Sequence, residues 1–230
     1  MQAADIMTVD VITATPEMSV RDAAALMLDR GISALPVLDR DIRLVGIISE
    51  GDLVRRTETG TDPKVSWWLS LFTSTPTLQE RFLKSHGRQV GDVMTRDPIA
   101  VRPDAPVAEI AATLERNRIK RVPVVENGKV LGVVSRANLL HALASAEADS
   151  FTGTADDRSL RDNVLKAFSD EAGLGGVFVN VTVSSGDVRL WGTVNSDIEE
   201  KALIAAARSV PGVASVESNL GRVPEWVYGY

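Results

Sequence analysis

The sequence predicts an α/β protein with two copies of a β-α-β-β-α repeat and a smaller α-β-β-α-β domain behind them. Three observations lead to this prediction. A block of about fifty residues occurs twice, each copy shows a helical hydrophobic period before two short apolar runs, and a separate pattern of alternating hydrophobic residues begins near residue 177. The length of 230 residues also exceeds that of a typical single domain, so more than one compact unit is expected.

The internal repeat shows as matching residues at a constant spacing. Asp5-Ile6-Met7-Thr8 returns as Asp92-Val93-Met94-Thr95, an offset of 87 residues (92 − 5). The same offset pairs Ile12 with Ile99, Pro16 with Pro103, Val20 with Val107, Ala24-Ala25 with Ala111-Ala112, Ile32 with Ile119, and Pro36-Val37 with Pro123-Val124. After one extra residue in the first copy's turn, the offset becomes 86 and pairs Gly46 with Gly132, Ser49 with Ser135 and Leu53 with Leu139.

Both copies contain the same predicted elements. A helix over 19–30 and its counterpart over 106–117 each carry one apolar face. Short strands are predicted at 35–38, 44–48, 122–125 and 130–134. The second pair is joined by Asn127-Gly128, the strongest short signal for a hairpin, and a last helix begins at Ser49 or Ser135. One repeat leaves a sheet face uncovered, so we expect the two copies to pack about a pseudo-twofold axis, with candidate ligand clefts along it.

The C-terminal pattern differs from that of the repeat. Apolar residues at 160, 164, 165 and 168 mark a helix. Valines at every second position over 177–183, answered by Val188-Leu190-Gly192-Val194, predict a hairpin. A helix over 196–209 and a strand over 213–220 follow. The predicted domains are 1–56 and 92–145 for the repeats, 57–91 for a helical insertion, 146–156 for a linker, 157–222 for the C-terminal domain and 223–230 for an aromatic tail.

Composition narrows the possible functions. A net charge of -6 and a pI near 5.1 disfavour nucleic-acid binding, which needs clustered Lys and Arg. The chain has no cysteine, and His86 and His141 lack a second His at ligand spacing, so we expect both to be structural or surface residues and expect no metal site. Neither a secretory signal nor an apolar run of ~18 residues is visible, so we expect a cytoplasmic protein.

Two aromatic segments allow alternative interpretations. Trp67, Trp68, Leu71 and Phe72 give the insertion an amphipathic stripe beside basic charge. Such a stripe can lie on a membrane surface, although packing against the parent domain or a dimer mate is the favoured interpretation. Trp226, Tyr228 and Tyr230 in the tail fit either insertion at a lipid interface or packing on a partner.

The repeat resembles the CBS domain family, and specifically a tandem CBS pair. The resemblance rests on the paired Asp-x-Met-Thr starts, on Leu35-Pro36-Val37 and Val122-Pro123-Val124, and on the segments 46–52 and 132–138, and it covers about residues 1 to 145. CBS pairs commonly bind AMP, ADP, ATP, NAD or S-adenosylmethionine and regulate another function through them. The resemblance therefore implies an adenine nucleotide, AMP, ADP or ATP, as a regulatory ligand rather than a catalytic cofactor.

The resemblance also implies a set of nucleotide-binding residues. Ser49 and Asp52 would hold the ribose, Lys120 and Arg121 the phosphates, and Thr13, Ala14, Ala34 and Pro36 would line the base, while Ser135 and Asn138 take the ribose positions of a weaker second cleft. An ionised Asp only accepts hydrogen bonds, whereas Asn offers one carbonyl and a competing amide donor, so Asp52 is the better ribose clamp. Simpler roles remain open, because Ser49-x-x-Asp52 is also a capping box and a basic pair is favoured near a helix C-terminus.

The C-terminal pattern resembles the BON domain through residues 188–194 and 210–220, over about residues 157 to 222. That family is associated with phospholipid or envelope attachment, but residues 151–230 carry seven basic against eleven acidic side chains, so simple binding to anionic lipid is disfavoured. We therefore predict a non-enzymatic regulator that binds an adenine nucleotide, forms a homodimer and signals to a protein partner. The alternative is a structural adaptor in which the CBS pair only dimerises and the BON-like domain recruits a protein or membrane surface. An enzyme is least favoured, because no nucleophile and base set, P-loop or metal cluster is visible.

Overall fold

The computed structural model describes residues 1–54, 86–145, 154–170 and 179–222. It divides into two compact units. The first-repeat unit holds residues 11–100 and 125–130, and the second-repeat unit holds residues 1–10, 101–124 and 131–230, which include the C-terminal domain. The predicted aromatic stripe of the insertion, the start of the first C-terminal strand at 177–178 and the aromatic tail lie outside the described residues.

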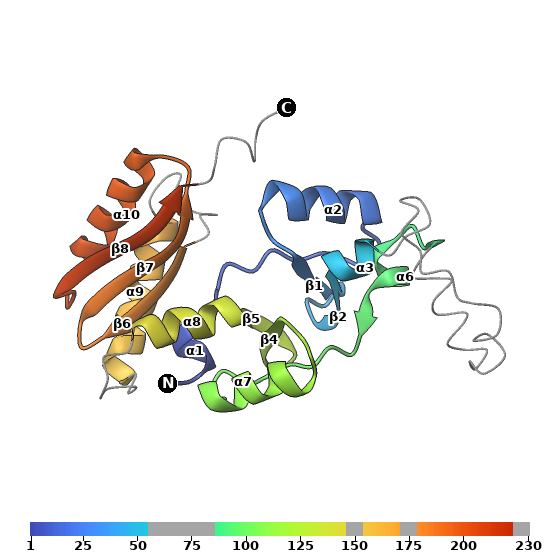
Figure 1. Ribbon diagram of the computed structural model, residues 1–230, viewed down its shortest axis with the longest axis horizontal. Coiled ribbons are helices and arrows are strands. Elements are labelled where there is room, and N and C mark those ends of the chain that lie inside the picture. The colour runs from blue at the N-terminus through green and yellow to red at the C-terminus, as the bar shows by residue number, and fades with distance from the viewer. Residues whose placement is uncertain (55–85, 146–153, 171–178, 223–230) are drawn as a thin grey trace. The chain divides into compact units, whose positions relative to one another are not determined.

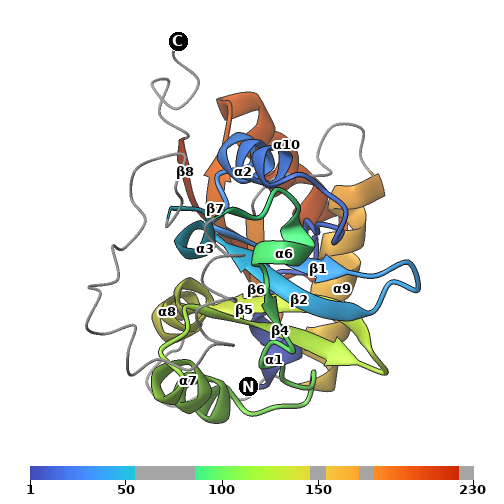
Figure 2. The ribbon, with the colours of Figure 1, turned by 90° about the vertical axis from the view of Figure 1, so that its right-hand side faces the viewer.

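The first-repeat unit has a sheet of order β1-β2-β3, with β1 (Ala34–Leu38) and β2 (Leu44–Ser49) antiparallel and the short β3 (Thr95–Arg96) on the far side of β2. Helix α2 (Val20–Asp29) begins where the Ser19 hydroxyl accepts from the Asp22 N–H, and it ends before Gly31, whose φ of 59° suits the left-handed turn after a helix. Helices α3 (Glu50–Val54) and α6 (Val90–Val93) also belong to the described part of this unit (Figures 1 and 2).

The second repeat is built in the same way. Strands β4 (Arg121–Glu126) and β5 (Lys129–Ser135) pair, α7 (Val107–Arg116) precedes them, α8 (Arg136–Ser145) follows, and α1 (Ala3–Ile6) packs beside α8 (Figure 1). The predicted turn between the strands is present, because Asn127 and Gly128 both have positive φ, at 51° and 82°. A two-residue turn with positive φ at both positions matches the twist of a hairpin.

The two repeats exchange their starting segments. The core of the first-repeat unit combines Val20, Leu35 and Ile48 with Val90 and Val93, which come from the segment that starts the second repeat in the chain. The core of the second repeat contains Ala3, Ile6 and Met7 from the N-terminus together with Ile110, Leu114, Val122, Val124 and Val134. Each segment also joins its unit through backbone hydrogen bonds, such as Val90 N–H to the Met18 carbonyl and Ala3 N–H to the Ala105 carbonyl, both 2.9 Å. The sequence pattern did not predict this exchange.

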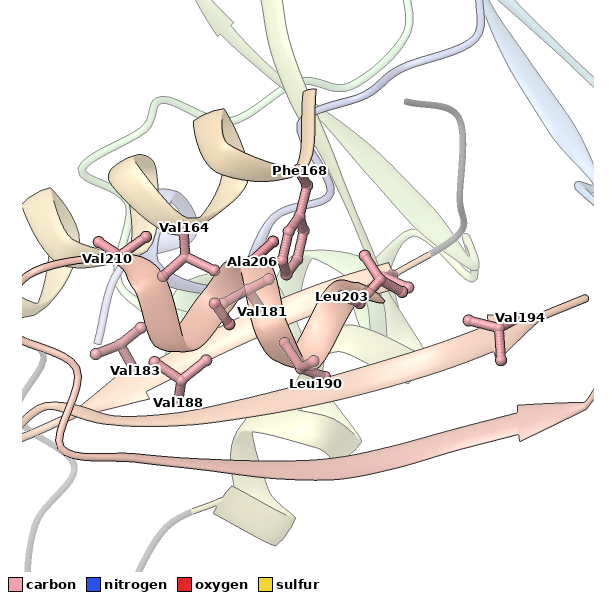
Figure 3. Close-up of a cluster of buried hydrophobic side chains, with 12 residues drawn as sticks. Val164, Phe168, Val181, Val183, Val188, Leu190, Val194, Leu203, Ala206 and Val210 are labelled. Carbon is pink, nitrogen blue, oxygen red and sulfur yellow. The ribbon is translucent and has the colours of Figure 1, made fainter. Parts of the chain in front are cut away.

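The C-terminal domain has the predicted α-β-β-α-β order. Helix α9 (Ala155–Asp170) precedes the antiparallel pair β6 (Val179–Ser184) and β7 (Asp187–Val194), and α10 (Asp197–Ser209) leads to β8 (Ser215–Arg222), which lies parallel to β7. Figure 3 shows how Val164 and Phe168 of α9 and Leu203 of α10 gather over Val181 and Leu190 of the sheet. The core holds twelve buried residues, which lie on the two helices, just after α10 and on one face of the sheet. The alternate side chains of β6 and β7 therefore point to the opposite face.

Candidate functional site

Six of the ten predicted nucleotide-binding residues lie in the first-repeat unit, and backbone contacts bring most of them together. Ala14 N–H donates to the Pro36 carbonyl over 2.9 Å, and Leu38 N–H donates to the Ala14 carbonyl over 2.9 Å. Ala34 is the register partner of Ser49 across β1 and β2. The segment around Thr13 and Ala14 therefore runs along the outer edge of β1, while Ser49 ends β2 beside the start of β1.

Ser49 and Asp52 form a local hydrogen-bonded pair at the junction of β2 and α3. One carboxylate oxygen of Asp52, Oδ2, accepts from the Ser49 N–H over 3.0 Å and from the Ser49 hydroxyl over 2.8 Å. Both residues are half-buried, whereas Ala14, Ala34 and Pro36 are buried. The arrangement places a carboxylate, which can only accept hydrogen bonds, close in the fold to a small apolar wall.

The other four predicted residues lie in the second-repeat unit. Arg136 N–H donates to the Lys120 carbonyl over 3.1 Å, just as Glu50 N–H donates to the Ser33 carbonyl over 3.0 Å in the first repeat. Lys120 and Arg121 thus stand beside Ser135 of their own repeat. At the offset of 87 residues Arg121 takes the place of Ala34, so the second repeat has a guanidinium where the first has a methyl group.

Asn138, the equivalent of Asp52, contacts both its own repeat and the N-terminal segment. Its Oδ1 accepts from the Ser135 N–H over 2.8 Å and from the Ser135 hydroxyl over 2.6 Å. Its Nδ2 donates to the Ile6 carbonyl over 2.8 Å and to the Thr8 hydroxyl over 3.3 Å. The residue is only 5% exposed, so the change from Asp to Asn comes with a buried contact to the N-terminal segment.

Two further residues belong to the same arrangement and were missed in the sequence. Val101 N–H donates to the Pro123 carbonyl over 3.0 Å, which repeats the contact between Ala14 and Pro36. The signal was available, because an offset of 87 residues links Ala14 to Val101 and Pro36 to Pro123. Val101 and Pro123 are therefore the wall residues of the second repeat.

The two histidines differ in their surroundings. His86 is exposed, whereas His141 of α8 is half-buried and stacks on Trp191 of β7, with ring centroids 5.0 Å apart and planes 11° apart. Burial lowers the pKa of the His141 imidazole, so its neutral form is favoured at this contact. His141 is thus placed as a packing residue between the second repeat and the C-terminal domain.

Two kinds of feature are absent from the described part of the chain. Across residues 1–54, 86–145, 154–170 and 179–222, no helix is long and apolar enough to cross a bilayer. In the same ranges, no three His, Asp or Glu side chains lie close enough together to hold a metal ion.

Comparisons with known proteins give consistent matches. Residues 3–58 and 90–145 match the family model of the CBS domain, and residues 156–223 match that of the BON domain. The chain is 30% identical over 148 residues to the chloroplastic CBS domain-containing protein CBSX2 of Arabidopsis thaliana, a match that covers 60% of this chain and 61% of that protein. It is 35% identical over 133 residues to an uncharacterized protein of Methanocaldococcus jannaschii, covering 53% of this chain and 79% of that protein.

A solved structure is also similar. The crystal structure of CBSX2 in complex with AMP superimposes with a TM-score of 0.56 at 30% identity, and the match covers 64% of this chain and 98% of that one. These matches cover 53–64% of this chain, and residues 156–223 are matched by the BON family model.

Proposed function

Because this chain belongs to the CBS domain family, with a BON domain behind its two CBS repeats, we propose that it is a non-enzymatic regulatory protein that binds an adenine nucleotide and signals to a partner. The ligand site we propose is in the first repeat. The observation that carries this proposal is the Ser49–Asp52 pair, which stands beside the apolar wall of Ala14, Ala34 and Pro36. The related plant structure with bound AMP supports the class of ligand.

The chemistry of Asp52 suits a ribose. Its two carboxylate oxygens offer about four acceptor sites, and the hydrogen bonds from Ser49 converge on one of the oxygens. Two vicinal hydroxyls can donate to such a group, and hydrogen bonds to a charged acceptor contribute about 1.5–3 kcal/mol each. The family resemblance places a planar base beside Ala14, Ala34 and Pro36, which the structure brings together along β1.

Calorimetry with AMP, ADP, ATP and adenosine on the full chain tests the proposal. We expect at least one nucleotide to bind, and Asp52→Ala to lower its affinity tenfold or more. If Asp52 serves only as a helix cap, the same variant will instead lose about 1 kcal/mol of stability and keep its affinity for nucleotide. Unfolding and titration measured on one preparation therefore separate the two roles.

The basic pair is tested by comparing ligands with and without phosphate. The family resemblance predicts that Lys120 and Arg121 contact phosphate, so Lys120→Ala and Arg121→Ala should weaken AMP and ATP binding while adenosine binding stays unchanged. Equal losses for AMP and adenosine would mean that the two side chains do not contact the phosphates.

One observation favours the adaptor alternative. The side-chain amide of Asn138 forms hydrogen bonds to Ser135, Ile6 and Thr8, so it has to break one of them before it can bind a ribose. A ligand at 100 times its dissociation constant stabilises the folded state by about 2.7 kcal/mol. If millimolar AMP, ADP and ATP all leave the melting temperature unchanged, the regulator is excluded and the adaptor is favoured.

A further inference from the structure

The short helix α1 is where three parts of the second-repeat unit meet. Its last carbonyls have no partner inside so short a helix, and a helix end that is buried needs other donors. Asn138 of α8 donates to the Ile6 carbonyl, and Asn180 of β6 donates to the same oxygen over 3.3 Å. Arg161 of α9 donates to the carbonyls of Ala4 and Met7. Side chains of the second repeat and of the BON domain therefore cap α1 together.

Arg161 is the central donor of this joint. It is 2% exposed, and its Nε donates to the Val181 carbonyl of β6 over 2.8 Å while its two terminal nitrogens reach α1. Burial lowers the pKa of the guanidinium to about 10, although Asp162 and Asp5 act in the opposite direction, so the group is still charged at neutral pH. A buried charge is costly unless it is fully hydrogen-bonded, and the rigid fork of an arginine serves three carbonyls at once.

A second ionic contact fixes the other side of α1. Arg158 of α9 lies 2.7 Å from the carboxylate of Asp5, which also accepts from the Gln2 N–H over 2.7 Å. Asp5 is buried, whereas its counterpart in the first-repeat unit, Asp92 of α6, is exposed and accepts only a 3.3 Å hydrogen bond from the Gln89 N–H among its described contacts. The two repeats thus share a sequence motif but differ in what covers it.

The sheet of the BON domain provides the opposing surface. Asn180 and Thr182 alternate with the core valines of β6, so a free domain would present these two polar side chains to water. In this chain both are buried, and α1 and α8 are the elements packed against β6 on that side. The stacked rings of His141 and Trp191 extend the contact onto β7.

The identity of residue 138 matters for this joint. An asparagine has two acceptor and two donor positions, and in Asn138 these are used by Ser135 twice, by Ile6 and by Thr8. An aspartate there would have no donor for the Ile6 carbonyl and would place two acceptors against each other in a buried site. The asparagine thus suits the α1 contact, and its hydrogen-bonding groups are already used within the chain.

We propose that the second CBS repeat is the docking platform of the BON domain, with α1 as the joint between them, and that Asn138 serves this joint instead of a nucleotide. The polar face of strands β6 and β7 is thus covered by α1 and α8 of this same chain. Ligand binding by the first repeat rests on the function proposed above. The contact between the second repeat and the BON domain, called the dock below, does not depend on it.

Hydrogen exchange followed by mass spectrometry on the full chain tests the dock. Arg161→Met removes the central donor with a side chain of similar length, and we expect amide exchange to rise at least tenfold in residues 3–8 and 179–184. Residues 197–209 of α10 and 34–49 of the first repeat should keep their wild-type protection. Arg208→Met, which changes an exposed arginine of α10 in the same domain, is the matched control and should alter none of these segments.

A second variant approaches the joint from the other side. Asn138→Asp lies outside the BON domain, so it should raise exchange in 3–8 and 179–184 even if Arg161→Met also loosens α10. Unchanged exchange of 179–184 in Asn138→Asp overturns the proposal. Titration of Arg161→Met with AMP, ADP and ATP keeps the two proposals apart. Nucleotide affinity within about twofold of wild type is expected, whereas wild-type protein that binds none of the three refutes the nucleotide site and leaves the exchange test of the dock intact.

Discussion

Replacing Gly132 by alanine tests how tightly the exchanged N-terminal segment is held. A Cβ built on Gly132 of β5 would lie 2.6 Å from the sulfur of Met7 and 2.8 Å from the carbonyl oxygen of Thr8. The methionine side chain is flexible and can turn aside. The Thr8 carbonyl cannot, because Thr8 and Val133 exchange two backbone hydrogen bonds of 3.0 Å each.

The size of the effect follows from this geometry. Adding a methyl group to a well-packed site that cannot relax destabilises the folded state by about 1–3 kcal/mol. Alanine also lowers the conformational entropy of the unfolded chain, which raises stability by about 0.4–1 kcal/mol and partly offsets this cost. For a chain of this length each kcal/mol shifts the melting temperature by about 2–4 °C. The net loss is about 0.6–2 kcal/mol, so we expect Gly132→Ala to melt roughly 1–8 °C below wild type in a calorimetric scan.

A matched substitution provides the control. Gly51 of α3 would place its Cβ 3.6 Å from the Ser49 hydroxyl, an ordinary contact, so Gly51→Ala should melt at or slightly above the wild-type temperature. If Gly132→Ala is as stable as Gly51→Ala, residues 7 and 8 do not pack on β5 and the exchange of segments is refuted.

Two other predictions follow from the described contacts. Burial acts to raise the pKa of Asp157, but hydrogen bonds from Thr154 and from the Ser185 and Gly186 backbone outweigh it, so the pKa lies below the ordinary 3.8. The carboxylate therefore stabilises the fold above pH 3.8. This stabilisation is lost as the pH falls through the lowered pKa. Asp157→Asn replaces hydrogen bonds to a charged acceptor by bonds to a neutral amide, so it should be less stable than wild type at pH 7 by urea unfolding, and a difference that persists undiminished at pH 2 would contradict this. The chain should also form a homodimer, because Leu140 and Leu143 on α8 are 64% and 63% exposed, and light scattering that finds a 24.7 kDa particle at micromolar concentrations would refute it.

The repeat and the turns could be predicted from the sequence because their signals are local. A constant offset requires two similar cores, and the equivalent helices, strands and hairpins appear in both units. The turn at Asn127-Gly128 and the one at Ser185-Gly186 both have positive φ at each position, as a two-residue hairpin connection needs. The residues that form these features lie within a few positions of one another.

The exchange of starting segments and the dock could not be predicted in this way. Both depend on which distant surfaces meet, and hydrophobic spacing does not encode that. Alternation along β6 correctly assigns its valines to the domain core, but it also suggests that Asn180 and Thr182 face water, where the structure buries them. A second compact surface with donors and acceptors in register is needed to bury such groups without a large cost.

The two Ser-x-x-Asx motifs show why a motif match alone predicts too many ligand sites. Ser49-x-x-Asp52 and Ser135-x-x-Asn138 have the same spacing and the same local hydrogen bonds from serine. What separates them is the donor pair of the amide, which in Asn138 joins α8 to the N-terminal segment. A carboxylate cannot form that link, and an asparagine that has formed it must break a buried hydrogen bond before it can bind a ribose. The amide contacts of Asn138 therefore support the proposed dock in the second repeat and favour the first repeat for the proposed ligand site.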